Sequence, residues 1–230
     1  MNSVILDFQT RSQEIEGYFR FVLRLAKQEV ALQASAGTAD YSSHEHEELL
    51  KTFKATCYLL LYNLVESTMR NAVEAIFDEL QAKQASYDEC REELKREILK
   101  NFKKRDMDKL LPKLLSLARD VVHETFELSE TFAGNLDARA IKLTAKRFGF
   151  AEPAGNKFWM LQTVKDARND LAHGVKSFAD VGRNASPSDL ELARTQTVTI
   201  LTETLQNIET YLKRQEYLTA LHPQGLNWSI

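Results

Sequence analysis

Arg168 and His173 are five positions apart, and their side chains could act together in catalysis. Gly174 follows His173 directly. An imidazole titrates near neutrality and suits general acid–base catalysis. A guanidinium stays charged and holds phosphate oxygens through two parallel hydrogen bonds. Such a pair could serve RNA cleavage, in which the 2′-OH attacks the adjacent phosphorus while protons move and charge builds on the phosphate. The spacing alone is weak evidence, because a histidine at a helix end can simply donate to the last carbonyls.

The segment that carries this pair is expected to be a helix from Lys157 to His173, stopped by Gly174. An apolar stripe runs along it, formed by Leu161, Val164, Leu171 and Val175. Arg168 falls within this stripe, where a guanidinium needs a carboxylate, a phosphate or a subunit interface. The stripe itself is either part of a dimer interface or core within one chain. His173 lies about 140° round the helix from Arg168, so one site can use both only at the helix end or in a shared cleft.

Three further residues are candidates for supporting roles. Glu66 lies in the most apolar part of an earlier helix, where an unpaired carboxylate would be costly. It would pair with Arg168 or orient His173; alternatively, its carboxylate reaches solvent past small neighbours. Asn169 would position the pair through hydrogen bonds, or would be an ordinary surface residue. Asp170 is expected to face solvent rather than to act in catalysis.

A basic run further back in the chain offers candidate contacts for an RNA backbone, Lys100, Lys103, Lys104 and Arg105, preceded by Lys95 and Arg96. Acidic residues interleave with this run: Glu89, Glu92, Glu93 and Glu97. An ordinary solvated helix face is therefore the stronger interpretation.

Other residues that could tempt a functional interpretation are expected to be structural. Tyr62 and Trp159 are expected in the core rather than as platforms on which bases stack. His44 and His46 are two positions apart at a helix start, so their side chains point in different directions and predict no metal site. Cys57 and Cys90 are too few for a disulfide framework or a cysteine-based zinc site.

Helical periodicity dominates the elements that must position these residues. With only 8 Gly and 4 Pro in 230 residues and no strand pattern, the sequence predicts an all-α helical bundle. We expect five to six helices, with long first, second and last ones. Besides the segment before Gly174, the expected helices are about Val4–Leu32, Ser42–Lys83, Ser86–Lys104, 107–123, Asp137–Phe148 and Ser186–Tyr217. Capping boxes of Ser42 with Glu45 and of Ser86 with Glu89 are expected to begin two of them.

The stretch from Cys57 to Val65 is apolar on nearly every face, which predicts a central, surrounded helix. Residues 1–230 are expected to form one domain, with a charged helical insertion over 84–135 and a tail over 218–230.

Composition narrows the classes of function. A net charge of −3 argues against a protein that coats nucleic acid generally, although it permits a local basic groove. The N-terminus lacks the pattern of a signal peptide, and no uninterrupted apolar run of membrane-spanning length occurs. A cytoplasmic location is therefore expected.

Several segments, in the same order, are similar to one known family. Residues 168–174, RNDLAHG, resemble the R-x4–6-H motif of the HEPN superfamily (higher eukaryotes and prokaryotes nucleotide-binding), with its polar residue after the Arg. Residues 59–70, LLLYNLVESTMR, resemble the second-helix signature of the bacterial MAE-type HEPN-like nucleases. FAGNLDAR at 132–139, RFG at 147–149 and Phe178 also look like that family. The resemblance covers residues from about 10 to 215.

The resemblance implies a HEPN-type fold and a metal-independent endoribonuclease with no cofactor, in which Arg168 and His173 are catalytic. Its products would carry 2′,3′-cyclic phosphate and 5′-OH ends, and its context would be a toxin–antitoxin or phage-defence system. The implied partners are RNA, a second copy with both motifs in one cleft, and an antitoxin or regulatory protein, with no membrane.

Two other interpretations stay open. A catalytically silent HEPN module would bind RNA, nucleotide or a partner without cutting; the presence of both Arg168 and His173 argues against it. A purely structural protein would use the same two residues to cap helices at an interface.

Overall fold

The computed structural model describes residues 1–33, 41–103, 136–155 and 158–219, and for 101–103 only the backbone. Its elements are α1 (Asn2–Ala26), α2 (Ser43–Ala82), the 3-10 turn η1 (Tyr87–Glu89), α3 (Glu92–Lys103), α6 (Ala138–Phe148), α7 (Met160–Ala172), α8 (Phe178–Arg183) and α9 (Pro187–Lys213). The expected all-α class is confirmed: within these ranges β-structure is limited to one isolated bridge, between Cys90 and Leu218. The described part has seven α-helices, where five to six were expected.

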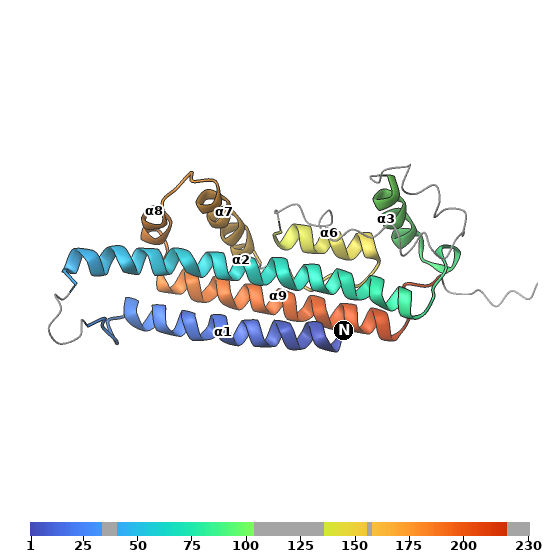
Figure 1. Ribbon diagram of the computed structural model, residues 1–230, viewed down its shortest axis with the longest axis horizontal. Helices are drawn as coiled ribbons and strands as arrows, with labels where there is room; N and C mark the ends of the chain where they lie inside the picture. Colours follow the sequence, from blue (N-terminus) through green and yellow to red (C-terminus); the bar gives the residue numbers. More distant parts are fainter. Residues whose placement is uncertain (34–40, 104–135, 156–157, 220–230) are drawn as a thin grey trace, which may run out of the picture.

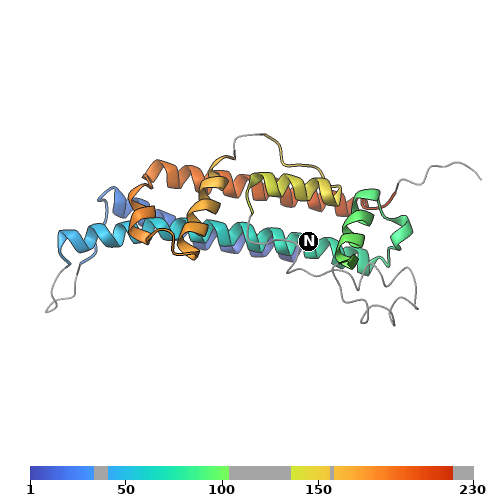
Figure 2. The same cartoon turned by 90° about the horizontal axis from the view of Figure 1, so that it is seen from above.

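Three long helices, α1, α2 and α9, lie side by side along the molecule (Figures 1 and 2). The short helices cover one side of this layer, with α7 and α8 near one end, α6 in the middle and α3 at the other end (Figure 1). Helix α2 packs against α1, α7, α8 and α9, and its segment from Cys57 to Val65 is largely buried. The expected central position of this segment is confirmed.

Most of the predicted helix ends are confirmed by their caps. Ser42 and Glu45 form the expected capping box at the start of α2. Asp137 accepts the Ala140 N–H at 2.8 Å to begin α6, which ends at Gly149 in the left-handed conformation, φ 84°. Ser186 begins α9 as expected, in a capping box that Asp189 completes.

Three details of the predicted helices differ from the structure. The first helix ends at Ala26, because Gln28 adopts a left-handed φ of 58° and the Glu29 N–H turns back to the Arg24 carbonyl. The Ser86 capping box begins only η1, and α3 starts at Glu92. Helix α8 was not expected. The segment expected as a helix at 107–123, most of the 84–135 insertion and most of the 218–230 tail lie outside the described residues.

A buried carboxylate joins α3 to α6. Glu97 on α3 is 1% exposed and accepts hydrogen bonds from Arg147 on α6 and from Lys100, the latter at 2.6 Å. Burial alone would raise the pKa of Glu97, but the hydrogen bonds from Arg147 and Lys100 outweigh it and hold this pKa below its ordinary value. The folded state therefore favours the ionised carboxylate.

We expect Glu97→Gln to lower the free energy of unfolding by about 3 kcal/mol at pH 7, near the low end for breaking a buried pair because Lys100 is largely exposed. Because the pKa of Glu97 is lower in the folded state, its carboxylate stabilises the fold at any pH above its unfolded-state pKa. This stabilisation is lost as the pH falls through the folded-state pKa. Urea unfolding curves of wild type and Glu97→Gln should therefore converge in acid. Glu209→Gln, which removes a surface pair with Lys213, is the control and should change stability by less than about 1 kcal/mol. A constant gap between the two proteins from pH 7 to pH 3 would contradict this account.

Candidate functional site

The C-terminus of α7 is closed by a Schellman motif. His173 is the C-cap residue and Gly174 follows at φ 66°, a left-handed conformation that favours glycine. The Val175 N–H donates to the Asp170 carbonyl at 2.8 Å, and the Gly174 N–H donates to the Leu171 carbonyl at 3.3 Å. This turn ends the helix directly after His173, as the position of Gly174 predicted.

The His173 side chain is exposed, and its ring makes no hydrogen bond to any residue within the described ranges. The chain beyond it is held in place, because Lys176 donates to the Asp170 carboxylate at 2.7 Å. That hydrogen bond raises the pKa of Lys176. Asp170 therefore fixes the loop after His173, and the imidazole stays accessible.

Arg168 is half-buried and lies over the ring of Tyr62 on α2, with 4.6 Å between the guanidinium carbon and the ring centroid. It also donates to the Asn169 side-chain oxygen at 2.9 Å. Tyr62 is fully buried, as expected, and its hydroxyl accepts the Leu136 N–H at 3.4 Å. Burial raises the pKa of Tyr62 and the charge of Arg168 opposes this only in part, so the phenol under the guanidinium is neutral.

No carboxylate of the described residues lies within ion-pair distance of Arg168. Glu66, which the sequence left either as a partner of this site or as a carboxylate that reaches solvent, accepts from Arg70 one turn later on α2, at 3.2 Å. The Glu66 side chain is 25% exposed, so it reaches solvent at the edge of α2 and its charge is balanced locally. Among the described residues, the guanidinium of Arg168 is thus held by the Tyr62 ring and the Asn169 amide oxygen and faces no carboxylate.

The apolar stripe expected along α7 is shorter than predicted. Leu161 and Val164 are buried in the core between α7, α2 and α9, so this part of the stripe is intramolecular. Val175 is 70% exposed, because the chain has already left the helix at Gly174. Of the two interpretations of the stripe, core within one chain is correct for Leu161 and Val164.

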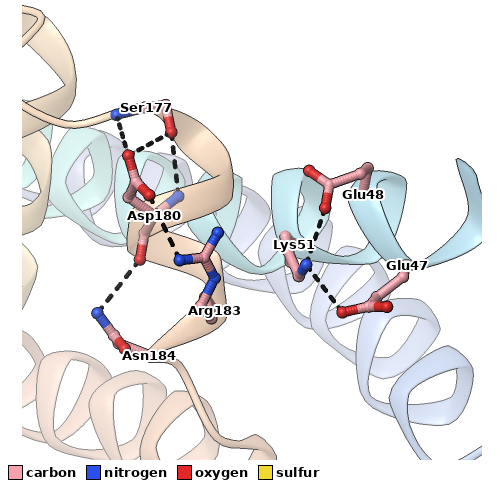
Figure 3. A network of polar contacts seen from close by, with 7 residues as sticks. All are labelled: Glu47, Glu48, Lys51, Ser177, Asp180, Arg183 and Asn184. Carbon is pink, nitrogen blue, oxygen red and sulfur yellow. Dashed lines mark hydrogen bonds and ion pairs between the residues drawn. The ribbon is translucent and has the colours of Figure 1, made fainter. Parts of the chain in front are cut away.

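Helix α8 anchors the far end of the loop that begins at His173. Ser177 caps it, accepting the Asp180 N–H at 3.1 Å and donating to the Asp180 carboxylate at 2.6 Å (Figure 3). Val181 and Gly182 of α8 are buried, and Gly182 lies against the backbone of Lys51 on α2. The Lys51 side chain pairs with Glu47 and Glu48 (Figure 3). The loop from His173 to Ser177 is therefore fixed at both ends.

Of the three basic side chains of the run that the structure describes, Arg96 is exposed and the two lysines are paired with glutamates. Lys100 is paired with the buried Glu97, and Lys95 pairs with Glu92 at 3.5 Å and lies over the Tyr87 ring. The side chain of Lys103 and the whole of Lys104 and Arg105 lie outside the described residues.

Trp159 was expected in the core and is instead 59% exposed. It is the N-cap residue of α7, between the buried residues Phe158 and Met160. The Met160 N–H donates to the side-chain oxygen of Gln196 on α9 at 3.0 Å, which fixes the start of α7. Since Phe158 and Met160 take the inward positions, the indole faces outward.

Other groups that could act chemically have structural surroundings. Cys57 and Cys90 are free and buried, and burial raises the pKa of their thiols to about 12 and about 11, so neither is a thiolate at neutral pH. His46 packs against the Tyr41 ring, with 5.6 Å between centroids. Throughout the described ranges, no three His, Cys, Asp or Glu side chains are grouped so as to hold a metal ion. Among the helices described, none is long and apolar enough to span a membrane.

A family model described as HEPN_MAE_28990:/-like HEPN matches residues 2–217. The match includes α2, α7 and the loop after His173, and so the whole of the site described above. Neither the curated proteins nor the solved structures contain a match to this chain.

Proposed function

The chain belongs to the MAE_28990-like HEPN family, and from this we propose that it is a metal-independent endoribonuclease whose catalytic residues are Arg168 and His173. HEPN domains are generally associated with ribonuclease activity, and commonly bind RNA and form dimers. We place the enzyme in a toxin–antitoxin or phage-defence system, where an antitoxin or regulatory protein restrains it.

The observation that carries the proposal is the state of Arg168. The guanidinium is half-buried over the Tyr62 ring, and the described part of the chain supplies no carboxylate to it, so an anion that binds there gains a charge-assisted contact without displacing an ion pair. A phosphate of RNA is such an anion and binds through the fork of N–H donors. The accessible imidazole of His173 at the end of the same helix supplies the acid–base group.

In the proposed reaction the 2′-oxygen forms a bond to the adjacent phosphorus and the bond from phosphorus to the 5′-oxygen breaks. One proton leaves the 2′-OH for a base, and one proton reaches the departing 5′-oxygen from an acid, so no net proton is consumed. Arg168 stabilises the charge that grows on the non-bridging phosphate oxygens. Asn169 positions Arg168 through its hydrogen bond.

Incubating the purified chain with total RNA, with and without EDTA, tests this function. Degradation that EDTA does not stop supports the nuclease. Binding without degradation supports the catalytically silent module, and neither binding nor degradation supports the structural protein.

We further propose that the active unit is a homodimer with both motifs in one cleft. One chain offers a single motif histidine, whereas the reaction uses a base and an acid, and a two-fold axis through one cleft supplies two His173 and two Arg168. Val175 and Phe178 support this arrangement, because both are exposed apolar side chains within five residues after His173 in the chain. They replace the expected interface residues Leu161, Val164 and Leu171: the first two are in the core of the same chain, and Leu171 is partly buried against it.

Sedimentation should give twice the 26.3 kDa chain mass at micromolar concentration. Mixed dimers of one intact chain and one chain with Arg168→Ala and His173→Ala should fall well below half of wild-type activity, since each catalytic event needs groups from both chains. Dimers of two intact chains, purified with the same two tags, are the control. A fully active monomer would rule out the dimer, and half activity in the mixed dimers would rule out the shared cleft.

A further inference from the structure

A surface pocket of about 730 Å³ lies between α6 and the start of α7, outside the groups assigned to catalysis. We name it the α6–α7 groove, and define it by Arg139, Lys142, Leu143, Lys146, Trp159 and Lys165. These residues come from one face of α6 and from the N-terminal half of α7.

Two of the side chains that line the groove are apolar and exposed. Trp159 is 59% exposed and Leu143, also lining the groove, is 55% exposed. An exposed tryptophan is unusual on a protein surface that binds nothing, because its indole buries well and serves as a contact at interfaces. A nucleobase can stack on such a ring whatever its identity, because every base has a flat π face.

The walls of the groove are predominantly positive. The lining residues include four basic and two acidic side chains, in a chain whose net charge is −3. On α6, Arg139, Lys142 and Lys146 are three and four residues apart and so share one face over about 10 Å of helix. The lining therefore keeps a formal excess of two positive charges, although Asp137 accepts from Lys165 at 2.7 Å, Glu152 lies 3.5 Å from Lys146, and Lys142 donates to the Gly155 carbonyl at 2.6 Å.

Helix α7 connects the residues that line the groove to the catalytic pair. Gln162 and Lys165 line the groove, and Arg168 and Asn169 follow at steps of three and four residues on the same side of the helix. A second link runs through α2: Tyr62, which lies under Arg168, accepts the N–H of Leu136, the neighbour of Asp137. A chain held in the groove can therefore reach the guanidinium of Arg168 without leaving this face of α7.

We propose that the α6–α7 groove binds single-stranded RNA, with one base stacked on Trp159 and the neighbouring phosphates on Arg139 and Lys146. This inference rests on the proposed function, because it assigns where the enzyme holds its substrate on the side leading to Arg168. It favours unpaired RNA, since a base inside a duplex exposes no face to an indole.

The test measures binding of a fluorescein-labelled 12-nucleotide RNA to the full chain carrying His173→Ala, which removes cleavage during the measurement. Adding Trp159→Ala should weaken binding about tenfold, and adding Trp159→Phe should weaken it far less because a ring remains. Adding Lys146→Glu should weaken binding and flatten its salt dependence. Lys213→Glu is the matched control: this lysine is 71% exposed against 67% for Lys146, is also paired with a glutamate, and should leave binding unchanged.

An abasic oligonucleotide of the same length separates stacking from charge. On it the effect of Trp159→Ala should disappear and that of Lys146→Glu should remain. The proposal would be overturned if the Trp159→Ala and parent proteins bound the RNA with equal affinity, or if Trp159→Ala weakened binding to the abasic strand as much as to the RNA. It would also be overturned if the parent bound no RNA, and the groove would then be assigned to a protein partner.

Measuring RNA cleavage by the chain with His173 intact distinguishes failure of the groove from failure of the proposed nuclease. If that chain cuts no RNA while binding still depends on Trp159, the nuclease fails and the groove stands. If it cuts RNA and Trp159→Ala changes neither the affinity nor kcat/KM, the groove fails and the nuclease stands.

Discussion

Replacing His173 by alanine is expected to reduce RNA cleavage by at least about a thousandfold, since a positioned acid–base group contributes roughly 10²–10⁴-fold and a shared cleft would lose two of them. The helical CD signal and the melting temperature should stay near those of wild type, because the His173 side chain is exposed and its removal leaves no cavity. A labelled RNA, followed on a gel beside a thermal melt of the same preparation, gives both readouts. Wild-type cleavage by His173→Ala would remove this histidine from the mechanism.

Arg168→Ala should have an effect of similar size, and Arg168→Lys should rescue little of it. A lysine keeps the charge but loses the planar fork that holds two phosphate oxygens and stacks on Tyr62. Asp166→Ala is the control on the same helix, because Asp166 is exposed and hydrogen-bonded only to Gln162 among the described residues. Full activity in Arg168→Lys would mean that only the positive charge matters at this position.

Gly182→Ala is expected to cost both stability and activity. A Cβ at this position would lie 1.8 Å from the backbone oxygen of Lys51, far inside contact distance, so α8 must move away from α2. Overpacking typically costs about 1–3 kcal/mol, and more where the opposing atom is backbone that cannot rotate away. Because α8 anchors the loop that begins at His173, cleavage should fall as well.

Gly17→Ala is the matched control for this prediction. Gly17 lies in α1, and a Cβ added there meets nothing within 4 Å. Its replacement should raise the free energy of unfolding by about 0.5–1 kcal/mol, since glycine loses more backbone freedom than alanine on folding. Thermal unfolding of the two variants beside wild type measures both effects, and a Gly182→Ala protein that melts with wild type would show that α8 is not docked as described.

Local chemistry explains why much of the frame could be predicted. The caps at Ser42, Asp137 and Ser186 and the stop at Gly174 depend on a few neighbouring residues, so the sequence specifies them. Helix α8 has only six residues, too few for a periodic pattern, and its position depends on the contact of Gly182 with α2.

The sequence predicted which residues belong to the candidate site better than it predicted the contacts that their side chains make. The position of Arg168 and His173 at a helix end followed from Gly174. The pairing of Glu66 with Arg70 was available from their spacing of four residues, whereas the stacking of Arg168 on Tyr62 joins two helices far apart in the chain.

The basic face of α6 could also have been predicted from the sequence, because Arg139, Lys142 and Lys146 are three and four residues apart in a predicted helix. The outward direction of Trp159 could not be predicted in this way, because it depends on how Gln196 of α9 fixes the start of α7.

The most direct test of the central claim uses two oligonucleotides that differ in one atom. The cleavage position is mapped first on an all-RNA strand, and the second strand carries a single 2′-deoxy sugar on the 5′ side of that position. In EDTA, the protein should cut the RNA strand to a 2′,3′-cyclic phosphate and a 5′-OH and should leave the substituted strand intact at that position, because the attacking oxygen is missing. Equal cutting of both strands, or cutting of the RNA strand that EDTA abolishes, would contradict a metal-independent nuclease that uses the 2′-OH with Arg168 and His173.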